Sequence, residues 1–364
     1  MIMNYKSYLK NKLFDFFTSR WSKGMARAES IEMGQLNLNG LTSEEMKSVK
    51  TIWGKIISPS PKYYQMFKTL EGFNSQFVSV DVYYPIIMRA LNPLAYSKSF
   101  SHKGFYPFLY KDIPQPRFYI NRVRGVYYNS ELKVITRNEA IYILKQVDEV
   151  IIKVTKNTGC GKNVSKIQPR KENLELLIDD FGEDYIVQEV LKQPEYTAKY
   201  NPQSLNSFRI STLNINGRCS LCSAVFRCGQ NGATVDNTGS GGIMVGVGED
   251  GRFREYGYDM KYNRHYKSSN GIEFKDGYIP NMHKIIETVI QWHQRYLPNL
   301  GHCGWDIALN EDGNPVFIEV NLVYPGIQYE QICVGKPHFG ERTDELIQFV
   351  MKNKPRFEIA NAVD

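Results

Sequence analysis

The segment GWDIALNEDGNPVFIEVN carries acidic residues at a spacing that could bind a cation. Apolar and polar residues alternate on both sides of its Asp-Gly pair, a pattern that predicts a β-hairpin with a two-residue turn. Symmetry about that turn pairs Ile307 with Ile318 and places Asp306 directly opposite Glu319. Because like charges at facing positions repel, we expect positive charge to lie between these two carboxylates.

Asn321 follows Glu319 by two residues and therefore lies on the same face of the predicted strand. Carboxylate and amide oxygens are ligands that Mg²⁺ accepts, usually together with water and phosphate. The segment thus predicts a magnesium site formed by Asp306, Glu319 and Asn321. The alternative is a solvated hairpin edge whose carboxylates pair with neighbouring Lys or Arg side chains.

A second segment, IIKVTKNTGCGKNV, joins a predicted buried strand to a glycine-containing loop. The strand carries Lys153, and the loop holds Thr158, Gly159 and Gly161. Such loops let backbone N–H groups approach phosphate oxygens closely, so the segment is a candidate phosphate-binding site. It does not match the Walker pattern, which needs a glycine five residues before Gly161. Lys153 could also simply extend from the strand end into water.

A third segment is the predicted strand DYIVQEVL, at whose end the chain leaves the sheet. The backbone and one acidic side chain of such an exit strand can pair with the edge of an adenine ring. The residues concerned are Gln188, Glu189, Val190 and Leu191. Taken alone, this segment is not specific for that role.

The composition is that of a globular protein with no marked bias. The chain has 364 residues, of which 42% are hydrophobic and 23% charged, which is enough for two or three subdomains with their own cores. Its formal charge of +7 comes from scattered residues, so nucleic acid is not an expected partner. No signal-like or membrane-spanning apolar run is present, and the sequence therefore predicts a cytoplasmic protein.

The cysteines and the basic N-terminus each leave two interpretations. Cys219-x-x-Cys222 with Cys228 suggests zinc, but the motif lies in a predicted strand and lacks a fourth ligand, which favours simple packing. Residues 5–21 form a predicted basic amphipathic helix. Such a helix can lie on an anionic membrane, or it can dock on the next domain.

The pattern of predicted helices and strands changes near residue 100. Before it, the sequence predicts mainly helices, one of them opened by a capping box of Thr42 and Glu45. After it, strands and helices alternate, and a second capping box of Thr136 and Glu139 opens another helix. The predicted fold class is α+β.

A second hairpin, turning at Asn216-Gly217, carries further polar candidates. Symmetry about this turn pairs Asn206 with Arg227, whereas Arg209 pairs with Ala224 and points to the other face. Without a bulge, the two arginines therefore cannot reach one phosphate. In the loop that follows, Asp236 and Asn237 with Gly241 and Gly242 are expected to shape the acceptor side or to form only an edge loop.

In this order and spacing, the segments resemble the ATP-grasp fold. The 13 residues from Asp306 to Glu319 are similar to the spacing in D-alanine–D-alanine ligases. The strings LNSFRISTL, FRCGQNGATVDNTGSGGI and GWDIALNEDGNPVFIEVN resemble the sugar-transfer-associated ATP-grasp group, over residues 90–345. The chain departs at Gly304, where D-alanine ligases carry a basic residue.

The resemblance implies a domain division and a role for each candidate. Residues 1–95 would be a mainly helical region, 96–192 a nucleotide-binding lobe with a glycine-loop lid, 193–355 a C-terminal lobe with the metal site, and 356–364 a tail. Lys103 and Lys153 would hold the α- and β-phosphates of ATP while the loop 157–162 closes over them. The exit strand, through Glu189 and Leu191, would bind adenine.

The same resemblance implies the chemistry. Asp306, Glu319 and Asn321 would hold two Mg²⁺ ions, and Arg209, with Arg227 and Asn206 as further candidates, would contact the transferring phosphoryl group. A substrate carboxylate would attack the γ-phosphate, and an amine would then displace phosphate from the acyl phosphate.

The implied substrates are a small carboxylate and an amine in cell-surface polysaccharide synthesis, one of them attached to a nucleotide or lipid-linked sugar. The alternatives are a kinase of the same fold that phosphorylates a small-molecule hydroxyl, and a nucleotide-binding scaffold without catalysis.

Overall fold

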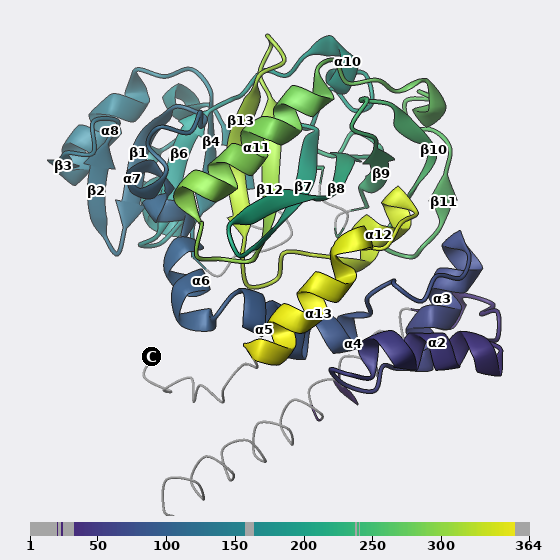
Figure 1. Cartoon of the computed structure of the whole chain (residues 1–364). Helices are drawn as coiled ribbons and strands as arrows, with labels where there is room; N and C mark the ends of the chain where they lie inside the picture. Colours follow the sequence, from purple (N-terminus) through teal and green to yellow (C-terminus); the bar gives the residue numbers. More distant parts are fainter. Residues whose placement is uncertain are drawn as a thin grey trace, which may run out of the picture.

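In the described residues, two antiparallel sheets lie beside each other (Figure 1). The computed structural model describes residues 33–156, 164–236 and 241–353, together with Arg20, Lys23, Gly24 and Gly239. The predicted basic amphipathic helix over residues 5–21 (apart from Arg20), the loop 157–162 with Thr158, Gly159 and Gly161, Asn237, and the tail 356–364 lie outside the described residues.

The first sheet has the strand order β3-β2-β1-β6-β4-β5. Its strands are β1 (Phe118–Val123), β2 (Val126–Asn129), β3 (Val134–Ile135), β4 (Val150–Val154), β5 (Val164–Ile167) and β6 (Tyr185–Glu189). Helices α8 (Arg137–Lys145) and α9 (Leu174–Asp180) pack on it through a small apolar core that includes Ile141, Ile152 and Ile178. The capping box of Thr136 and Glu139 that begins α8 is confirmed.

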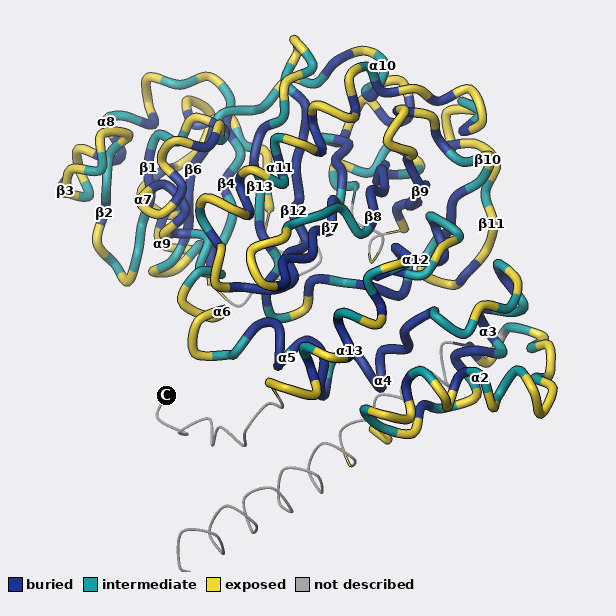
Figure 2. The backbone as a smooth tube through the Cα atoms, viewed as in Figure 1, coloured by how far each residue is buried: buried dark blue, intermediate teal, exposed yellow. Residues whose placement is uncertain are grey.

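The second sheet has the order β11-β10-β9-β8-β7-β12-β13. Its strands are β7 (Ser207–Ile215), β8 (Arg218–Cys228), β9 (Ile243–Val247), β10 (Phe253–Tyr258), β11 (Arg264–His265), β12 (His302–Leu309) and β13 (Pro315–Asn321). The helix α11 (Met282–Tyr296) crosses one face, where its apolar side packs against Phe208 and Trp305. Figure 2 shows the central strands of this sheet as its most deeply buried part.

The opposite face of the second sheet is covered by helices from both ends of the chain. The C-terminal helices are α12 (Gln328–Val334) and α13 (Thr343–Lys352). The N-terminal ones are α2 (Ser43–Trp53), α3 (Pro61–Glu71), α4 (Val80–Val82), the π-helical turn η2 (Tyr83–Ile87) and α5 (Met88–Leu91). The next helix, α6 (Leu94–Phe100), contacts the other core through Phe100. One apolar core joins residues of both groups to β7–β10.

Polar contacts also join the segment before α4 to α12. The Gln331 side chain accepts from the Val78 N–H and donates to the Val78 carbonyl, both at 2.9 Å. The helix α2 begins at the predicted capping box of Thr42 and Glu45, which is confirmed. The boundary near residue 95 stays a prediction.

The two sheets are joined through a short segment before β1. It follows η3 (Lys103–Phe105) and α7 (Tyr106–Leu109), and the Phe317 N–H of β13 donates to its Pro114 carbonyl at 2.7 Å. The remaining regular elements are η1 (Met33–Gln35), η4 (Pro169–Lys171), α10 (Glu195–Ala198), η6 (Phe274–Asp276) and η7 (Gly340–Arg342). No helix within the described residues is long and apolar enough to cross a membrane.

Glu71, at the end of α3, is the acidic centre of the contact between α3 and β10. Its carboxylate accepts from Arg254 Nη2 at 2.9 Å and from the Tyr258 hydroxyl at 2.6 Å, and its side chain is 3% exposed. We expect Glu71→Ala to lower the free energy of unfolding by about 3 kcal/mol, because it leaves a half-buried guanidinium without its counter-charge. Urea denaturation measures this loss. Glu44→Ala in the exposed first turn of α2 is the control, and an equal loss in both variants would contradict the assignment.

Candidate active site

The two facing carboxylates lie on neighbouring strands as expected. Asp306 of β12 pairs with Glu319 of β13. The expected pair of Ile307 with Ile318 is wrong, because Ile307 pairs with Phe317. The turn is one residue longer than predicted, and a bulge at Ile318 restores the register before Glu319 is reached.

Asp306 is held by two arginines. The Arg209 guanidinium binds it with two donors, Nε to Oδ1 and Nη2 to Oδ2, the latter at 3.1 Å. Arg227 Nη2 lies 3.3 Å from the same Oδ2. Burial raises the pKa of Asp306, but the charges of Arg209 and Arg227 outweigh it and hold this pKa below its ordinary value. Asp306 is therefore ionised at neutral pH.

A bulge in the second hairpin lets both arginines reach this carboxylate. The register of β7 and β8 shifts at Cys222, so that Arg227 pairs with Ser207 and Arg209 with Val225. The predicted pairings of Arg227 with Asn206 and of Arg209 with Ala224 are wrong. The bulge that the sequence required for a joint role of the two arginines is present, and they share one face of the sheet.

Asn206 directly precedes β7 and takes no part in this cluster. Its amide nitrogen donates to the Thr197 and Asn201 carbonyls at 2.9 Å, and its amide oxygen accepts from Ser204 at 2.9 Å. The side chain is fully buried. These contacts use its hydrogen-bonding groups to fix the chain between α10 and β7.

Glu319 pairs with a lysine that precedes the first sheet. Lys103 Nζ of η3 lies 2.9 Å from Glu319 Oε2, so this ion pair links η3 to β13. Burial lowers the pKa of Lys153 in β4 to about 8, with the positive charge of Lys103 adding to the shift and Glu319 opposing it. Two lysines and Glu319 thus face one another where the sheets meet.

Asn321 completes the predicted metal set. Its amide nitrogen donates to the Gly304 carbonyl at 3.3 Å and to Asp306 Oδ2 at 3.4 Å. Gly304 cannot carry a side chain, because a Cβ there would touch the Pro325 backbone. Asp306, Glu319 and Asn321 are therefore together at one end of the hairpin.

Part of the exit strand that was predicted to bind adenine is already hydrogen-bonded within the chain. Glu189 Oε1 accepts from the Arg117 N–H at 2.8 Å, and the buried Gln188 donates to the Pro116 carbonyl at 3.3 Å. Val190 and Leu191 follow the end of β6 and are half-buried. These contacts shape the exit from β6, where the backbone beyond Glu189 leaves the ladder.

Ser207 and Asp236 support Arg227 from one side. The Ser207 hydroxyl accepts from Arg227 Nη2 at 2.7 Å and itself donates to Asp236, whose carboxylate also accepts the Ser207 N–H at 3.0 Å. Burial raises the pKa of Asp236, while Arg227 opposes this shift. Asp236 therefore positions Arg227. Gly241 and Gly242 follow Asp236 in the sequence but take no part in these hydrogen bonds.

Glu330 was missed by sequence reasoning, and it supports Arg209 from the other side. Glu330 of α12 is buried, and its Oε1 lies 3.5 Å from Arg209 Nη1, which donates to the Pro325 carbonyl at 2.9 Å. A Cβ at Gly326 would collide with Glu330, and Gly326 has φ +84°, so only glycine fits between them. The Pro-Gly pair after the hairpin is the one signal that marked this turn.

The charges of this cluster fit a polyphosphate with divalent cations. Lys103, Lys153, Arg209 and Arg227 bring four basic side chains to one region, and Asp306, Glu319, Asp236 and Glu330 bring four carboxyl groups. Lysine and arginine side chains are donors that phosphate oxygens accept. Asp306, Glu319 and Asn321 supply hard oxygen donors of the kind Mg²⁺ requires.

Comparison with known proteins defines the family. The model of sugar-transfer associated ATP-grasp proteins matches residues 109–344. The chain belongs to this family. The match covers both sheets, the carboxylate pair and both arginines, but begins after Lys103. No curated protein matches the chain significantly.

Several solved structures resemble this ATP-grasp chain weakly. The ATP-grasp ligase PsnB in complex with a minimal precursor has 14% identity and a TM-score of 0.39, with 70% of this chain and 62% of that chain covered. D-alanyl-alanine synthetase A from Vibrio cholerae has 14% identity and a TM-score of 0.40, with 73% and 65% covered. D-cycloserine synthetase DcsG has 11% identity and a TM-score of 0.39, with 72% and 74% covered. The chain spans less than two thirds of the length of the first two.

Proposed function

We propose that the protein is an ATP-dependent carboxylate–amine ligase that forms an amide bond through an acyl phosphate. The observation that carries this proposal is the pair of arginines, Arg209 and Arg227, beside the Asp306–Glu319 pair. A second guanidinium at a phosphate site is useful when the phosphoryl acceptor is itself an anion, as a carboxylate is. The ligases among the weakly similar solved structures agree with this chemistry.

The arrangement of bases also favours a carboxylate acceptor over a hydroxyl. A kinase that phosphorylates a hydroxyl needs a base for its proton, whereas an ionised carboxylate attacks without one. In the described cluster, Asp306 and Glu319 are paired with Arg209 and Lys103, and Asp236 faces Ser207 and Arg227. These acids neutralise cations and are poorly placed to accept a proton.

In this mechanism Lys103 and Lys153 bind the phosphates of ATP, and Arg209 and Arg227 orient the γ-phosphate and the substrate carboxylate. Asp306, Glu319 and Asn321 would hold one or two Mg²⁺ ions, which supply charge neutralisation for the transferring phosphoryl group. Asp236 and Glu330 keep the arginines in place before the substrates arrive. The loop 157–162 would exclude water from the acyl phosphate.

We infer the substrate class from the family description. A sugar-transfer association suits a sugar acid or an amino acid joined to an amine during cell-surface polysaccharide synthesis, with one partner carried on a nucleotide or lipid. The protein would then work in the cytoplasm, where ATP and nucleotide sugars are available.

Hydroxamate trapping tests the reaction type. The protein is incubated with ATP, Mg²⁺, hydroxylamine and pools of amino acids, uronic acids and nucleotide-linked uronic acids. We expect ADP together with a hydroxamate, because hydroxylamine captures an acyl phosphate whatever the natural amine is. ADP with a stable phosphorylated product would identify a kinase instead.

The pH dependence of nucleotide binding tests the role of Lys153. Below pH 8 the Lys153 ammonium is charged, so ADP affinity should not change with pH. Above pH 8 Lys153 is mostly neutral and must take up a proton when ADP binds. We expect ADP affinity to fall by up to about tenfold per pH unit above 8, since one bound proton is linked to binding. Calorimetry between pH 7 and 10 measures this decrease. Lys153→Arg should remove it, and the same decrease in both proteins would exclude the assignment.

A further inference from the structure

Three potential metal ligands converge at a second place in the chain, outside the cluster described above. They are Cys222, His302 and His338, and one ligand atom of each lies within 4.8 Å of those of the others. Cys222 is the bulged residue of β8, His302 begins β12, and His338 lies between α12 and η7. They come from three separate segments and are brought together only by the fold.

The two imidazoles point ring nitrogens at each other. His302 Nε2 and His338 Nε2 are 2.9 Å apart, and both rings are at least 98% buried. The other nitrogen of His302, Nδ1, is bonded to the Tyr83 hydroxyl of η2. Metal-binding histidines usually donate their second N–H in this way, which fixes the ring and leaves Nε2 for the metal.

One ring nitrogen of this cluster is without a hydrogen bond. Within the described residues, the buried His338 Nδ1 has no partner. A buried polar group without a partner costs free energy. An ion that binds both Nε2 atoms and the sulfur would replace the hydrogen bond between the two imidazoles and would leave His302 Nδ1–H to donate to the Tyr83 hydroxyl.

We propose that Cys222, His302 and His338 bind one Zn²⁺ ion through the sulfur and the two Nε2 atoms. Two nitrogens and one thiolate form a donor set that zinc prefers over magnesium. On binding, the S–H bond breaks, its proton passes to solvent, and both histidines take the Nδ1–H tautomer. Three protein ligands leave the fourth position for water.

Such an ion would cross-link three parts of the chain. It would join β8 and β12 to the segment before α13, and through Tyr83 it would hold the π-helical turn of the N-terminal helices. His302 and Asp306 share one face of β12, and the charge of Arg209 acts on His302. The ion would therefore stiffen the strand that presents the active-site carboxylate.

Cobalt substitution tests this site in the full chain. Metal-free protein is titrated with Co²⁺, because a cobalt–thiolate bond absorbs in the near ultraviolet, whereas cobalt on carboxylates and amides alone does not. We expect one equivalent of Co²⁺ to produce this band and Zn²⁺ to remove it. Cobalt that bound only at Asp306 and Glu319 would give no such band, and zinc that bound only there would not remove it.

Cys222→Ser is the decisive variant, since it exchanges one atom and keeps both histidines. It should lose the band and weaken Zn²⁺ binding at least about 100-fold in competition with a chromophoric chelator. Cys219→Ser, three residues earlier on β8, is the matched control and should keep both. Absence of a band in wild-type protein, or equal Zn²⁺ affinity in the two serine variants, would overturn the proposal and leave a hydrogen-bonded histidine pair.

Discussion

Glu319→Gln should lower ATP-dependent turnover by at least about 100-fold while leaving the protein folded, because the amide cannot neutralise a divalent cation or Lys103. The Glu319 side chain is 25% exposed and pairs with Lys103 of η3, so its loss removes a contact that is not part of an apolar core. Release of ADP, with hydroxylamine and the best carboxylate pool, measures the effect. Circular dichroism and the melting temperature report on the fold.

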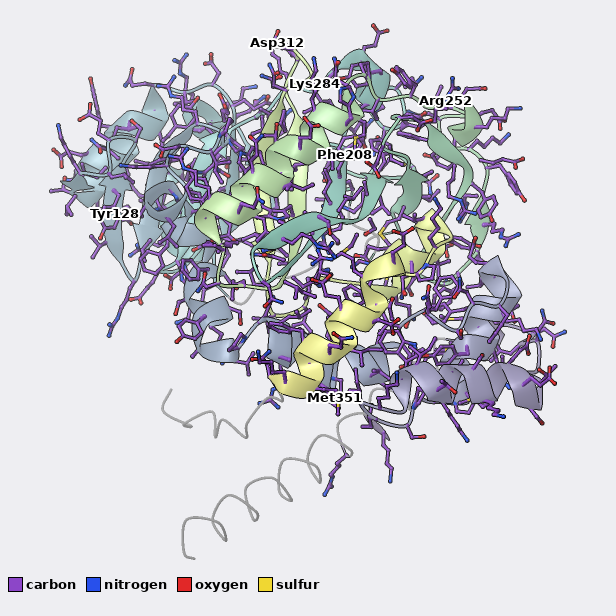
Figure 3. All side chains as sticks on the ribbon, viewed as in Figure 1. Tyr128, Phe208, Arg252, Lys284, Asp312 and Met351 are labelled. Atoms are coloured by element: carbon purple, nitrogen blue, oxygen red, sulfur yellow. The ribbon has the colours of Figure 1, made fainter. Side chains whose placement is uncertain are left out.

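Asp312→Asn is the matched control for this variant. Asp312 lies at the exposed tip of the same β12–β13 hairpin, away from the carboxylate pair (Figure 3). Its exchange removes the same charge from the same hairpin and should leave turnover within about twofold of wild type, as is usual for exposed positions. Near-normal turnover of Glu319→Gln would exclude Glu319 as a metal ligand.

Arg209→Met should reduce the free energy of unfolding by about 3 kcal/mol, because it leaves buried Glu330 without its cation and leaves Asp306 with Arg227 alone. It should also abolish hydroxamate formation. The pKa of Glu330 is already raised by burial, with Arg209 opposing the shift. Guanidinium denaturation of the variant and of wild type at pH 7 measures the loss.

Two further variants separate the charge effect from side-chain packing. Arg209→Met/Glu330→Gln should recover part of the lost stability, since one uncompensated carboxylate is gone. Arg252→Met, whose side chain is 80% exposed at the edge of the second sheet (Figure 3), should be neutral. If the double variant is no more stable than Arg209→Met, the loss does not come from an unpaired Glu330.

The carboxylate pair could be predicted from the sequence because both of its causes are local. The Asp-Gly pair fixes where the hairpin turns, and the alternation of apolar residues fixes which side chains share a face. Even so, the turn was predicted one residue too short. Asp306 still faces Glu319 only because the bulge at Ile318 adds the missing residue on the other strand.

The arginine cluster could not be predicted in full, because it depends on contacts between distant segments. Nothing in the sequence near Cys222 marks the bulge that brings Arg227 to the side of Arg209. Glu330 reads as an ordinary residue of a short helix, and only the packing of α12 against β8–β10 places it beside Arg209. Asn206 has a side chain that could contact a phosphoryl group, but it is bonded to Thr197, Asn201 and Ser204 and does not reach the arginines.

The attachment of Val78 to Gln331 has a consequence for the order in which the chain is completed at the ribosome. The two residues are 253 positions apart in the sequence. Tyr83 likewise cannot form its hydrogen bond until His302, 219 positions later, has been synthesised. At about 10 residues per second, Val78 emerges roughly 25 s before its partner exists. The N-terminal helices are therefore synthesised first but complete their packing last. Until then, their apolar faces are accessible to chaperones and to other nascent chains.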